Sequence, residues 1–420
     1  MRVLSLSSSD TTGGAAIAAC RLHQGLRMIG IESHMHVQRK NGDDQFVTGG
    51  RSILAKFSSQ LREHIDMSPT YLYRYRQKIR FSPAWLPGRA WLSELNKCVD
   101  IVHLHWINNG YIRIEDLALL RTPIIWTLHD MWAFTGGCHY DDGCGRYTTE
   151  CGNCPILGSN KRKDLAYRVY ERKRNAWRDL NLTLVSPSHW LTSCARQSTL
   201  LSQYRIKTIP NGLDLSIFKP IQKYEARIRC KLPQDKKLIL FGAMNATSDP
   251  RKGYMLLKTA LQKVSKKIWE SNIGLILFGN SKSIDTRDFG YPVFCMGSLY
   301  DNTTISSIYS AADLFVAPSI QDNLPNTVME SLACGTPCVA FNIGGMPDMI
   351  EHKLNGYLAK AYDTDDLANG IMWILNNVTH WPMLSRHARN KAQQEFGIVR
   401  IANQYCELYK EITELTRKKT

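Results

Sequence analysis

Short apolar runs recur along the whole chain, and each is followed by a segment with helical periodicity. The first half contains such runs at residues 2–7, 31–37, 99–106, 123–129 and 182–186. The second half contains them at residues 237–244, 273–279, 293–297, 314–318 and 337–341. Runs of this length that alternate with helices are typical of parallel strands buried on both faces. The pattern therefore predicts an α/β protein with two doubly wound parallel sheets.

A stretch rich in charge, proline and glycine separates the two series of strands, at residues 209–235. Such residues are typical of a linker. We therefore expect a first domain at residues 1–205 and a second at 206–397. Apolar residues then recur every three or four positions between Ile401 and Leu415, which predicts an amphipathic helix. We expect this helix, at about residues 398–420, to pack back on the first domain.

The chain is strongly basic, with 53 Lys and Arg against 37 Asp and Glu and a net charge of +16. This charge favours nucleic acids, nucleotide phosphates or an anionic membrane as partners. The sequence shows no apolar stretch of membrane-spanning length and no signal-peptide core, so we expect a cytoplasmic protein. Basic residues gather with aromatic or apolar ones at 71–91 and 161–178. Each stretch fits either a solvated helix face or contact with anionic lipid.

The most informative segment spans residues 318–337. A strand is expected to end at Pro318, and a helix to run from about Pro325 to Gly335. Asp322 then lies in the loop and Glu330 about one and a half turns into the helix. Helix-start amides bind phosphate and carboxylates accept hydroxyl hydrogens, which suits a ligand that carries both groups. Two acidic residues at this spacing are also common on surface helices, so the spacing leaves both interpretations open.

The residues around these carboxylates resemble the glutamate-x7-glutamate motif of the retaining GT-B glycosyltransferases of family 4. Residues 333–337, Ala-Cys-Gly-Thr-Pro, are similar to the continuation of that motif. The resemblance extends over most of the chain, to a glycine-rich loop at 13–16, a histidine turn at 127–130, a linker at 210–214 and a loop at 344–348. Residues 126–155 further resemble a capsule and exopolysaccharide subgroup of the colanic acid type.

This resemblance implies two Rossmann-like domains that face a cleft, with the acceptor on the N-terminal side and a nucleotide-sugar donor on the C-terminal side. The reaction would be glycosyl transfer with retention of anomeric configuration, without an obligate metal. The implied acceptor is a glycan, expected to be lipid-linked, in the synthesis of exopolysaccharide, capsule or lipopolysaccharide O-antigen. We therefore expect peripheral contact with an anionic inner membrane and no nucleic-acid partner.

Carried over to this sequence, the motif implies roles for four residues after the strand. Glu330 is implied to bind the nucleotide ribose, and Asp322 to approach the hydroxyls of the donor sugar. Asn323 and Leu324 are implied to offer backbone amides nearby. The family more often has glutamate at position 322, so the aspartate is one methylene shorter than usual.

The resemblance also implies a cationic site for the donor diphosphate and a catalytic role for Lys252, which aligns with the diphosphate-binding lysine. The partner arginine of the family would follow Gly242, but this chain has Ala243 there. Arg251 and Asn245 are the candidates to replace it. A surface charge pair is the alternative interpretation of Arg251 and Lys252.

In the first domain, the resemblance implies that His129 lies near the reacting centre and the acceptor. Gly13 and Gly14 would let the backbone approach the donor phosphate. A histidine at a strand end is otherwise usually a capping or core residue, and a glycine turn after a first strand is common.

Four cysteines fall within a short segment: Cys138, Cys144, Cys151 and Cys154. The last pair has the spacing of metal ligands, and the first pair is wider than usual. The cluster predicts a structural zinc site, with His139 as a substitute ligand. Buried free thiols, an iron–sulfur site and disulfides are alternatives that the sequence leaves open.

Two other functions are compatible with the sequence. The net charge and the cysteine cluster would suit a nucleic-acid-binding protein with a zinc module, although no groove-reading module is visible. A GT-B sugar epimerase is the second alternative. The base, the sugar, the acceptor linkage and the oligomeric state are not encoded in any motif that we can interpret.

Overall fold

The computed structural model describes residues 1–87, 90–242, 249–265, 272–279 and 290–417. The chain forms two compact units. Unit 1 comprises Met1–Gly212 with Val399–Thr420, and unit 2 comprises Leu213–Ile398. The division after Gly212 falls within the linker-like stretch at 209–235, a few residues beyond the boundary that we expected after residue 205.

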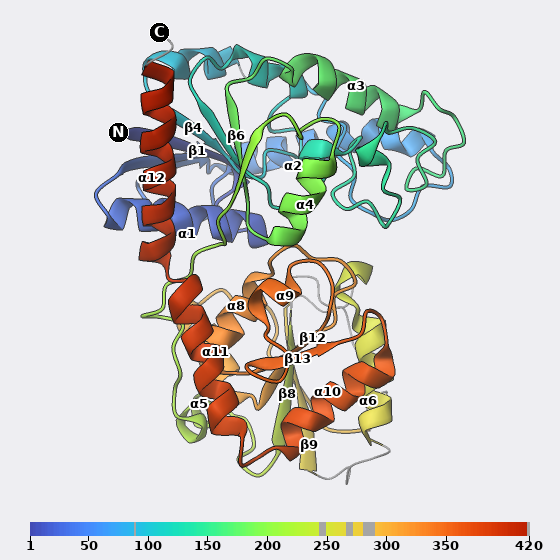
Figure 1. Cartoon of the computed structure of the whole chain (residues 1–420), viewed down its shortest axis with the longest axis vertical. Coiled ribbons are helices and arrows are strands. Elements are labelled where there is room, and N and C mark those ends of the chain that lie inside the picture. The colour runs from blue at the N-terminus through green and yellow to red at the C-terminus, as the bar shows by residue number, and fades with distance from the viewer. Residues whose placement is uncertain (88–89, 243–248, 266–271, 280–289, 418–420) are drawn as a thin grey trace. The chain divides into compact units, whose positions relative to one another are not determined.

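Unit 1 is built on a parallel sheet, which within the described residues has seven strands in the order β3-β2-β1-β4-β5-β6-β7 (Figure 1). The strands are β1 (Arg2–Ser9), β2 (Glu32–Arg39), β3 (Val47–Gly50), β4 (Ile101–Leu104), β5 (Ile124–Thr127), β6 (Leu182–Ser186) and β7 (Arg205–Thr208). The strands β4, β5 and β6 are buried along their whole length. Central strands of a parallel sheet are covered on both faces, which explains their continuous apolar runs.

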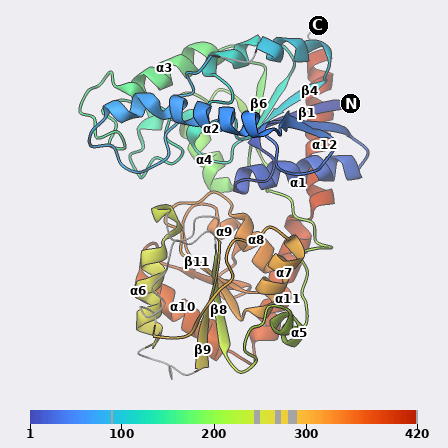
Figure 2. The same cartoon turned by 180° about the vertical axis from the view of Figure 1, so that it is seen from behind.

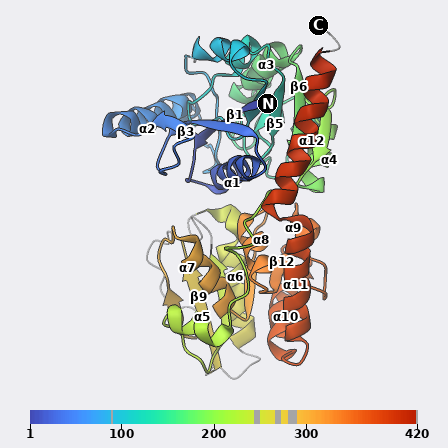
Figure 3. The same ribbon diagram turned by 90° about the vertical axis from the view of Figure 1, so that its left-hand side faces the viewer.

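The helices of unit 1 are α1 (Gly14–Met28), α2 (Ile53–Met67), α3 (Leu165–Trp177), α4 (His189–Gln197) and, from its second residue, α12 (Ile398–Arg417). Helix α12 runs alongside the sheet (Figure 3). Its residues Ile401, Tyr405, Leu408 and Ile412 are buried in one cluster with residues of β1, β4, β5 and β6. Leu415 continues the spacing but is 49% exposed. In the part of the chain that the structure describes, no helix has the length and hydropathy needed to cross a membrane.

Helix α3 carries most of the basic stretch at 161–178. Val169, Tyr170 and Trp177 are buried in the main core of unit 1. Arg172 forms an ion pair with Glu115, with Nε and Oε1 2.6 Å apart. The apolar side of this helix is therefore used by the core, and the solvated-face interpretation fits this stretch.

Unit 2 contains a second parallel sheet, with six strands among the described residues in the order β10-β9-β8-β11-β12-β13 (Figure 2). The strands are β8 (Lys237–Gly242), β9 (Ile273–Phe278), β10 (Val293–Cys295), β11 (Leu314–Ala317), β12 (Cys338–Phe341) and β13 (Gly356–Ala359). The helices are α5 (Lys223–Arg229), α6 (Tyr254–Ser265), α7 (Asn302–Ala311), α8 (Asn326–Ala333), α9 (Met346–Met349), α10 (Thr364–Asn376) and α11 (Trp381–Glu395). Two buried clusters form its core.

The predicted fold class is confirmed, because each of the ten predicted runs overlaps a strand of one of the two parallel sheets. The end of one run, residues 243–244, lies outside the described residues. The sequence pattern missed β3, β7 and β13. All three lie at the edge of a sheet, where a strand is partly exposed and does not need a continuous apolar sequence.

Candidate functional site

A partly buried ion pair joins two loops beyond the end of β11 in unit 2. Lys252 ends the short 3-10 helix η6 (Pro250–Lys252), and Asp322 lies in the loop between β11 and α8. The Nζ of Lys252 donates to Oδ2 of Asp322 at 2.6 Å, and Asp322 is only 6% exposed. The Ser319 hydroxyl donates to the same oxygen at 3.2 Å. The pair lies beyond the carboxyl end of an inner strand, where open α/β sheets bind ligands.

The environment of Asp322 keeps its carboxyl group ionised. Burial by itself raises the pKa of Asp322, but the charges of Lys252 and Arg251 outweigh burial and lower the pKa below its usual value. An ionised carboxylate accepts hydrogen bonds from hydroxyl groups. An ammonium group has three N–H donors, so Lys252 can hold Asp322 and an anionic ligand together. The pair therefore suits a ligand that has both hydroxyls and phosphate.

Two glycines allow these loops to pack closely. Gly253 follows Lys252 with φ of 69°, and a Cβ there would lie 1.8 Å from the carbonyl oxygen of Pro318. Gly344 has φ of 53°, and a Cβ there would lie 2.0 Å from the carbonyl oxygen of Asp322. Any other residue would clash with backbone at both positions and would adopt an unfavourable φ. The position of the Lys252–Asp322 pair is thus fixed by the backbone.

The other motif residues lie in and after the same loop. The Asn323 amide donates to Oδ1 of Asp322 at 3.0 Å, and Asn323 and Leu324 are both buried. Glu330 lies in α8 and accepts a hydrogen bond at 3.1 Å from the hydroxyl of Tyr309 in α7. Glu330 is 7% exposed, so it is not an ordinary surface acid. Sequence reasoning missed Tyr309, because nothing in the sequence relates α7 to the motif.

Arg251 is held beside the Lys252–Asp322 pair. One terminal nitrogen donates to the carbonyl oxygen of Gln321 at 3.2 Å, and the other lies 2.8 Å from Oδ2 of Asp249. Arg251 therefore contributes positive charge beside the Lys252–Asp322 pair. Ala243, at the position of the family's arginine, and Asn245, a candidate to replace that arginine, lie outside the described residues.

The first-domain candidates lie at the carboxyl ends of strands in unit 1. Gly13 follows β1 and precedes α1, whose first residue is Gly14. His129 follows β5, and its Nε2 is 3.1 Å from Nδ1 of His105, with the rings stacked at 5.4 Å. Burial lowers the pKa of His129 to about 4, against the opposing charge of Asp130. His129 is thus a neutral imidazole at physiological pH, able to donate or accept one hydrogen bond.

A small pocket lies against His129 in unit 1. It has a volume of about 10 Å³, and its other lining residues include His105, Thr127, Pro210 and Tyr405. A space of about this size holds roughly one water molecule. The pocket is too small for a sugar, so it does not by itself identify the acceptor.

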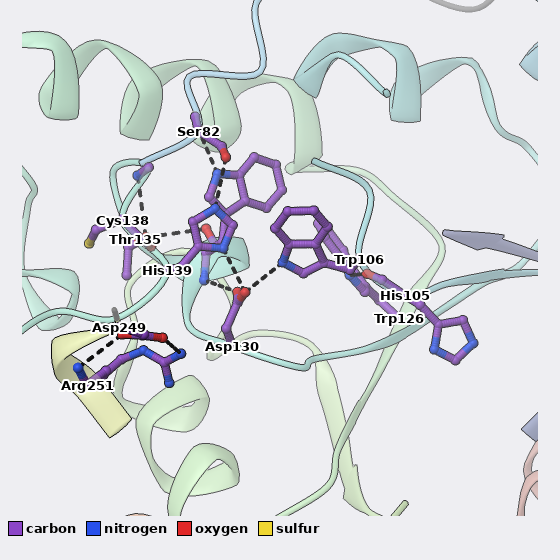
Figure 4. A network of polar contacts seen from close by, with 12 residues as sticks. Ser82, His105, Trp106, Trp126, Asp130, Thr135, Cys138, His139, Asp249 and Arg251 are labelled. Carbon is purple, nitrogen blue, oxygen red and sulfur yellow. Dashed lines mark hydrogen bonds and ion pairs between the residues drawn. The ribbon is translucent and has the colours of Figure 1, made fainter. Parts of the chain in front are cut away.

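A chain of polar contacts holds the turn that carries His129 (Figure 4). The Oδ2 of Asp130 is 2.7 Å from Nδ1 of His139 and accepts from the Trp106 indole at 2.8 Å. The Nε2 of His139 is 2.8 Å from the Ser82 hydroxyl, and the Trp132 amide donates to Oδ1 of Asp130 at 2.9 Å. Burial raises the pKa of Asp130, but its contact with His139 and its hydrogen bonds from Trp132 and Trp106 outweigh burial and lower this pKa. An ionised Asp130 only accepts, so His139 donates through Nδ1 and accepts from Ser82.

The contact chain predicts that His139 positions the turn. His139→Phe is expected to destabilise unit 1 by about 2 kcal/mol, because a bond to a charged, largely buried carboxylate is lost. Ser82→Ala is the matched control, since it removes only the outer hydroxyl and should cost about 1 kcal/mol. Urea midpoints measure both effects. Equal destabilisation by the two variants would contradict this role.

The zinc site that the cysteines predict is not found among the described residues. Cys138, Cys151 and Cys154 are buried in the hydrophobic core of unit 1, and Cys144 is half-buried. Across the described ranges, which include all four cysteines, no group of three or more potential ligands is arranged to hold a metal ion. Burial raises the pKa of Cys151 to about 12 and that of Cys154 to about 11, so they pack as protonated thiols. His139, the substitute ligand, binds Asp130 instead.

A buried lysine stabilises the cysteine-containing segment. Lys173 of α3 is fully buried, and its ammonium donates to the carbonyl oxygens of Trp132 and Thr135. It also lies over the Trp132 ring, 3.7 Å from the centroid. Burial lowers the pKa of Lys173 to about 7. The segment is therefore held by core packing and this lysine.

Comparisons with known proteins match each of the two units to a glycosyltransferase family. Residues 12–217 match the family described as Glycosyltransferase Family 4. Residues 235–377 match the family described as Glycosyl transferases group 1. The matches cover most of unit 1 before α12 and most of unit 2.

The chain is similar to an Escherichia coli (strain K12) protein named as a colanic acid biosynthesis glycosyl transferase, with 24% identity over 81% of this chain and 83% of that protein. It is also similar to the UDP-Gal:alpha-D-GlcNAc-diphosphoundecaprenol alpha-1,3-galactosyltransferase of Escherichia coli, with 24% identity over 49% of this chain and 54% of that protein. Among solved structures, sucrose-phosphate synthase from Thermosynechococcus elongatus aligns over 99% of both chains with a TM-score of 0.69 and 18% identity. That likeness confirms the GT-B fold.

Proposed function

Because the chain belongs to the group 1 glycosyltransferases of family 4, we propose that it moves a sugar from a uridine diphosphate sugar to a lipid-linked glycan. Glycosyl transfer from a nucleotide-sugar donor follows from the family. The uridine base and the lipid-linked acceptor are proposed because one relative is named for UDP-galactose and a diphosphoundecaprenol acceptor. The name of the colanic acid relative supports a role in surface polysaccharide synthesis, with the enzyme peripheral on the inner membrane.

The Lys252–Asp322 pair carries this proposal. Departure of the donor leaving group creates a cationic sugar and a nucleoside diphosphate with additional negative charge. Lys252, with Arg251 beside it, would stabilise that developing charge. Asp322 would accept hydrogen bonds from the sugar hydroxyls, and Glu330 would bind the ribose. Unit 2 is thus proposed to bind the donor.

Unit 1 is proposed to bind the acceptor. The neutral imidazole of His129 would contact the sugar and the attacking hydroxyl, and the backbone at Gly13 and Gly14 would approach the donor phosphate. Family members retain the anomeric configuration, so the acceptor oxygen would form its bond on the face from which the phosphate leaves. The bond from the sugar to the phosphate oxygen breaks, and the acceptor proton passes to that oxygen.

The two alternatives from the sequence are not supported. The family match makes the chain an enzyme of sugar transfer, so its basic charge does not require nucleic acid. The zinc module on which the nucleic-acid alternative relied is not formed by the described cysteines. An epimerase would act on the donor without an acceptor, and the relatives described above are named for transfer to another molecule.

A thermal-shift panel of UDP, GDP, ADP and CDP tests the donor site. We expect UDP to raise the unfolding temperature, because ligand at 100 times its Kd stabilises the folded state by about 2.7 kcal/mol. Glu330→Gln should lose this shift. Glu225→Gln is the matched control, since Glu225 is an exposed residue of α5 in the same unit. A shift with another base would reject uridine, and no shift with any nucleotide would reject the donor site.

A further inference from the structure

Helix α2 turns its apolar side away from unit 1. Its residues Ile53, Phe57, Leu61 and Ile65 are 86%, 63%, 49% and 38% exposed. They are spaced four apart, so they lie along one side of the helix. Leu54 falls on the same side and is 80% exposed. In Figure 3, α2 lies at the outer edge of the unit, beyond β3.

The polar side of α2 makes the contacts with the rest of unit 1. Asp66, the buried residue of this helix, accepts from the amides of Ala84 and Trp85 at 3.3 and 3.1 Å. Arg62 donates to the carbonyl oxygen of Gly110 at 2.8 Å. An ordinary surface helix buries its apolar side. Helix α2 does the reverse, so packing within unit 1 does not account for its apolar side.

The exposed apolar surface continues after the helix. The 3-10 helix η1 (Ser68–Leu72) places Tyr71 and Leu72 at 52% and 86% exposure, and Tyr75 follows at 76%. We call α2 with residues 68–76 the α2 surface. Large apolar side chains exposed in this number along one segment are typical of an interaction site.

The segment that forms the α2 surface is rich in basic residues. Residues 51–80 contain seven Lys and Arg and two acidic residues, of which Asp66 is buried. Arg62 contacts unit 1, and Arg51 and Arg80 are paired with Asp43 and Glu63. The remaining basic residues are Lys56, Arg74, Arg76 and Lys78, and the guanidinium groups of Arg74 and Arg76 lie over the rings of Tyr75 and Tyr71. The partner of this surface should therefore be apolar at its centre and negatively charged at its rim.

We propose that the α2 surface docks unit 1 on an anionic lipid bilayer. A helix with Phe, Leu and Ile on one side and Lys and Arg beside them lies in the plane of a membrane interface, with its apolar side among the headgroups and upper acyl chains. Tyrosines are suited to the same depth, because their rings are apolar and their hydroxyls are hydrated. Anionic headgroups attract the basic rim.

Charge argues against a second copy of this chain as the occupant. A two-fold contact places the same patch of both copies face to face. The basic rims would then oppose each other, and like charges across an interface are unfavourable. An anionic bilayer removes this repulsion and gains attraction from the same residues.

This proposal rests on the proposed function, which it deepens by giving the enzyme a way to reach a lipid-linked acceptor. Docking through α2 would hold unit 1, the proposed acceptor-binding unit, at the surface where such an acceptor is anchored. The lipid surface is a separate ligand from the nucleotide, so the two can be tested independently.

The test is flotation of the full chain with vesicles of phosphatidylcholine alone or of phosphatidylcholine mixed with the anionic lipid phosphatidylglycerol. We expect at least about tenfold tighter binding to the anionic vesicles, weakened by high salt because the rim charges are screened. The Ile53→Glu and Phe57→Glu double variant should lose that binding by at least about tenfold, because it removes apolar area and adds repulsive charge. The control is Tyr224→Glu with Ile228→Glu, two exposed apolar residues of α5 in unit 2, which should bind as wild type does.

Three results would overturn the proposal. They are unchanged binding of the α2 double variant, equal loss in the α5 control, and a wild-type dimer in sedimentation that the α2 variant dissociates. The nucleotide shift is measured without vesicles, and circular dichroism checks that each variant is folded. Loss of nucleotide binding with intact vesicle binding would reject the proposed function, whereas the opposite result would reject lipid docking.

Discussion

Lys252→Met is expected to lower kcat by about 10²- to 10³-fold, with the donor identified by the nucleotide panel. Methionine keeps the apolar stem of the lysine and removes only the charge. Loss of one preorganised group that stabilises developing negative charge usually costs about 3–4 kcal/mol of transition-state stabilisation. The ammonium lies 2.6 Å from Asp322 and is held by a loop that Gly253 fixes, so solvent cannot readily replace it. Steady-state kinetics measure the effect.

Two further variants separate charge from structure. Lys252→Arg keeps the positive charge and should recover part of the activity, but not all, because a planar guanidinium does not reproduce a compact ammonium. Lys263→Ala removes another lysine of unit 2, whose Nζ is 2.7 Å from Asp365, and should leave kcat unchanged. If Lys252→Met stays folded and retains activity within threefold of wild type, Lys252 does not stabilise the leaving group.

The fold could be predicted from the sequence because each inner strand is a continuous apolar run. The strand β6, with the sequence Leu-Thr-Leu-Val-Ser, is buried at every position, and its predicted and observed bounds agree. The strand β7 pairs with it at the edge, with the sequence Arg-Ile-Lys-Thr and only partial burial. An edge strand is ordered by its neighbour rather than by its own apolar pattern, so periodicity could not find it.

The candidate site could be predicted only in part. Asp322 and Glu330 lie in one segment, and strand and helix punctuation placed them correctly in a loop and a helix. Lys252 and Asp322 are 70 positions apart in the chain, and only the family resemblance brought them into one site. The spacing of residues along the chain does not indicate which loops contact each other in the fold.

Ligand spacing predicted a zinc site that the described residues do not show, because spacing does not give side-chain direction. The spacing between Cys151 and Cys154 fits a metal site, but the fold places both side chains in the core of unit 1 with Phe134 and Tyr147. His139 was considered only through its neighbour Cys138. Its actual partners, Asp130 and Ser82, are nine and 57 positions away, and no local motif indicates them.

Unit 1 is expected to lose stability steeply below about pH 6, because several of its histidines are buried as neutral rings. Burial lowers the pKa of His23 to about 4 and that of His103 to about 3. His105 is lowered well below its usual pKa for the same reason, and His129 to about 4. In the unfolded chain each histidine titrates near pH 6.5.

The direction of this pH dependence follows from which state, folded or unfolded, binds protons first as the pH falls. Below about pH 6.5 the unfolded chain takes up protons that the folded unit does not, so the free energy of unfolding falls as pH falls. The stability is fully present above pH 6.5 and is lost progressively toward the folded pKa values. Each fully shifted histidine contributes about 1.4 kcal/mol per pH unit. Several together would consume a typical domain stability of roughly 5–15 kcal/mol before pH 4.

The loss of stability at low pH should weaken the packing of α12 against the sheet in particular. The Nδ1 of His103 is 2.7 Å from the Tyr409 hydroxyl, and its Nε2 is 2.8 Å from Thr127, which also contacts Tyr405 at 2.8 Å. These bonds join the sheet to the C-terminal helix. When unfolding lets His103 take up a proton, the hydrogen bonds that hold α12 on the sheet are broken as well.

His103→Gln tests this account, because glutamine can bond the same hydroxyls but does not titrate. Urea unfolding followed by circular dichroism at pH 8, 6.5, 5.5 and 5 should show a flatter decline than wild type, by about 1.4 kcal/mol per pH unit below pH 6. At pH 8 the variant should be less stable than wild type by about 1–2 kcal/mol, the usual cost of imperfect buried hydrogen bonds. His64→Gln, an exposed residue of α2, should decline as wild type does. If the free energies of unfolding of wild type and His103→Gln fall in parallel with pH, His103 is protonated in the folded unit. Its burial would then not contribute to the loss of stability in acid.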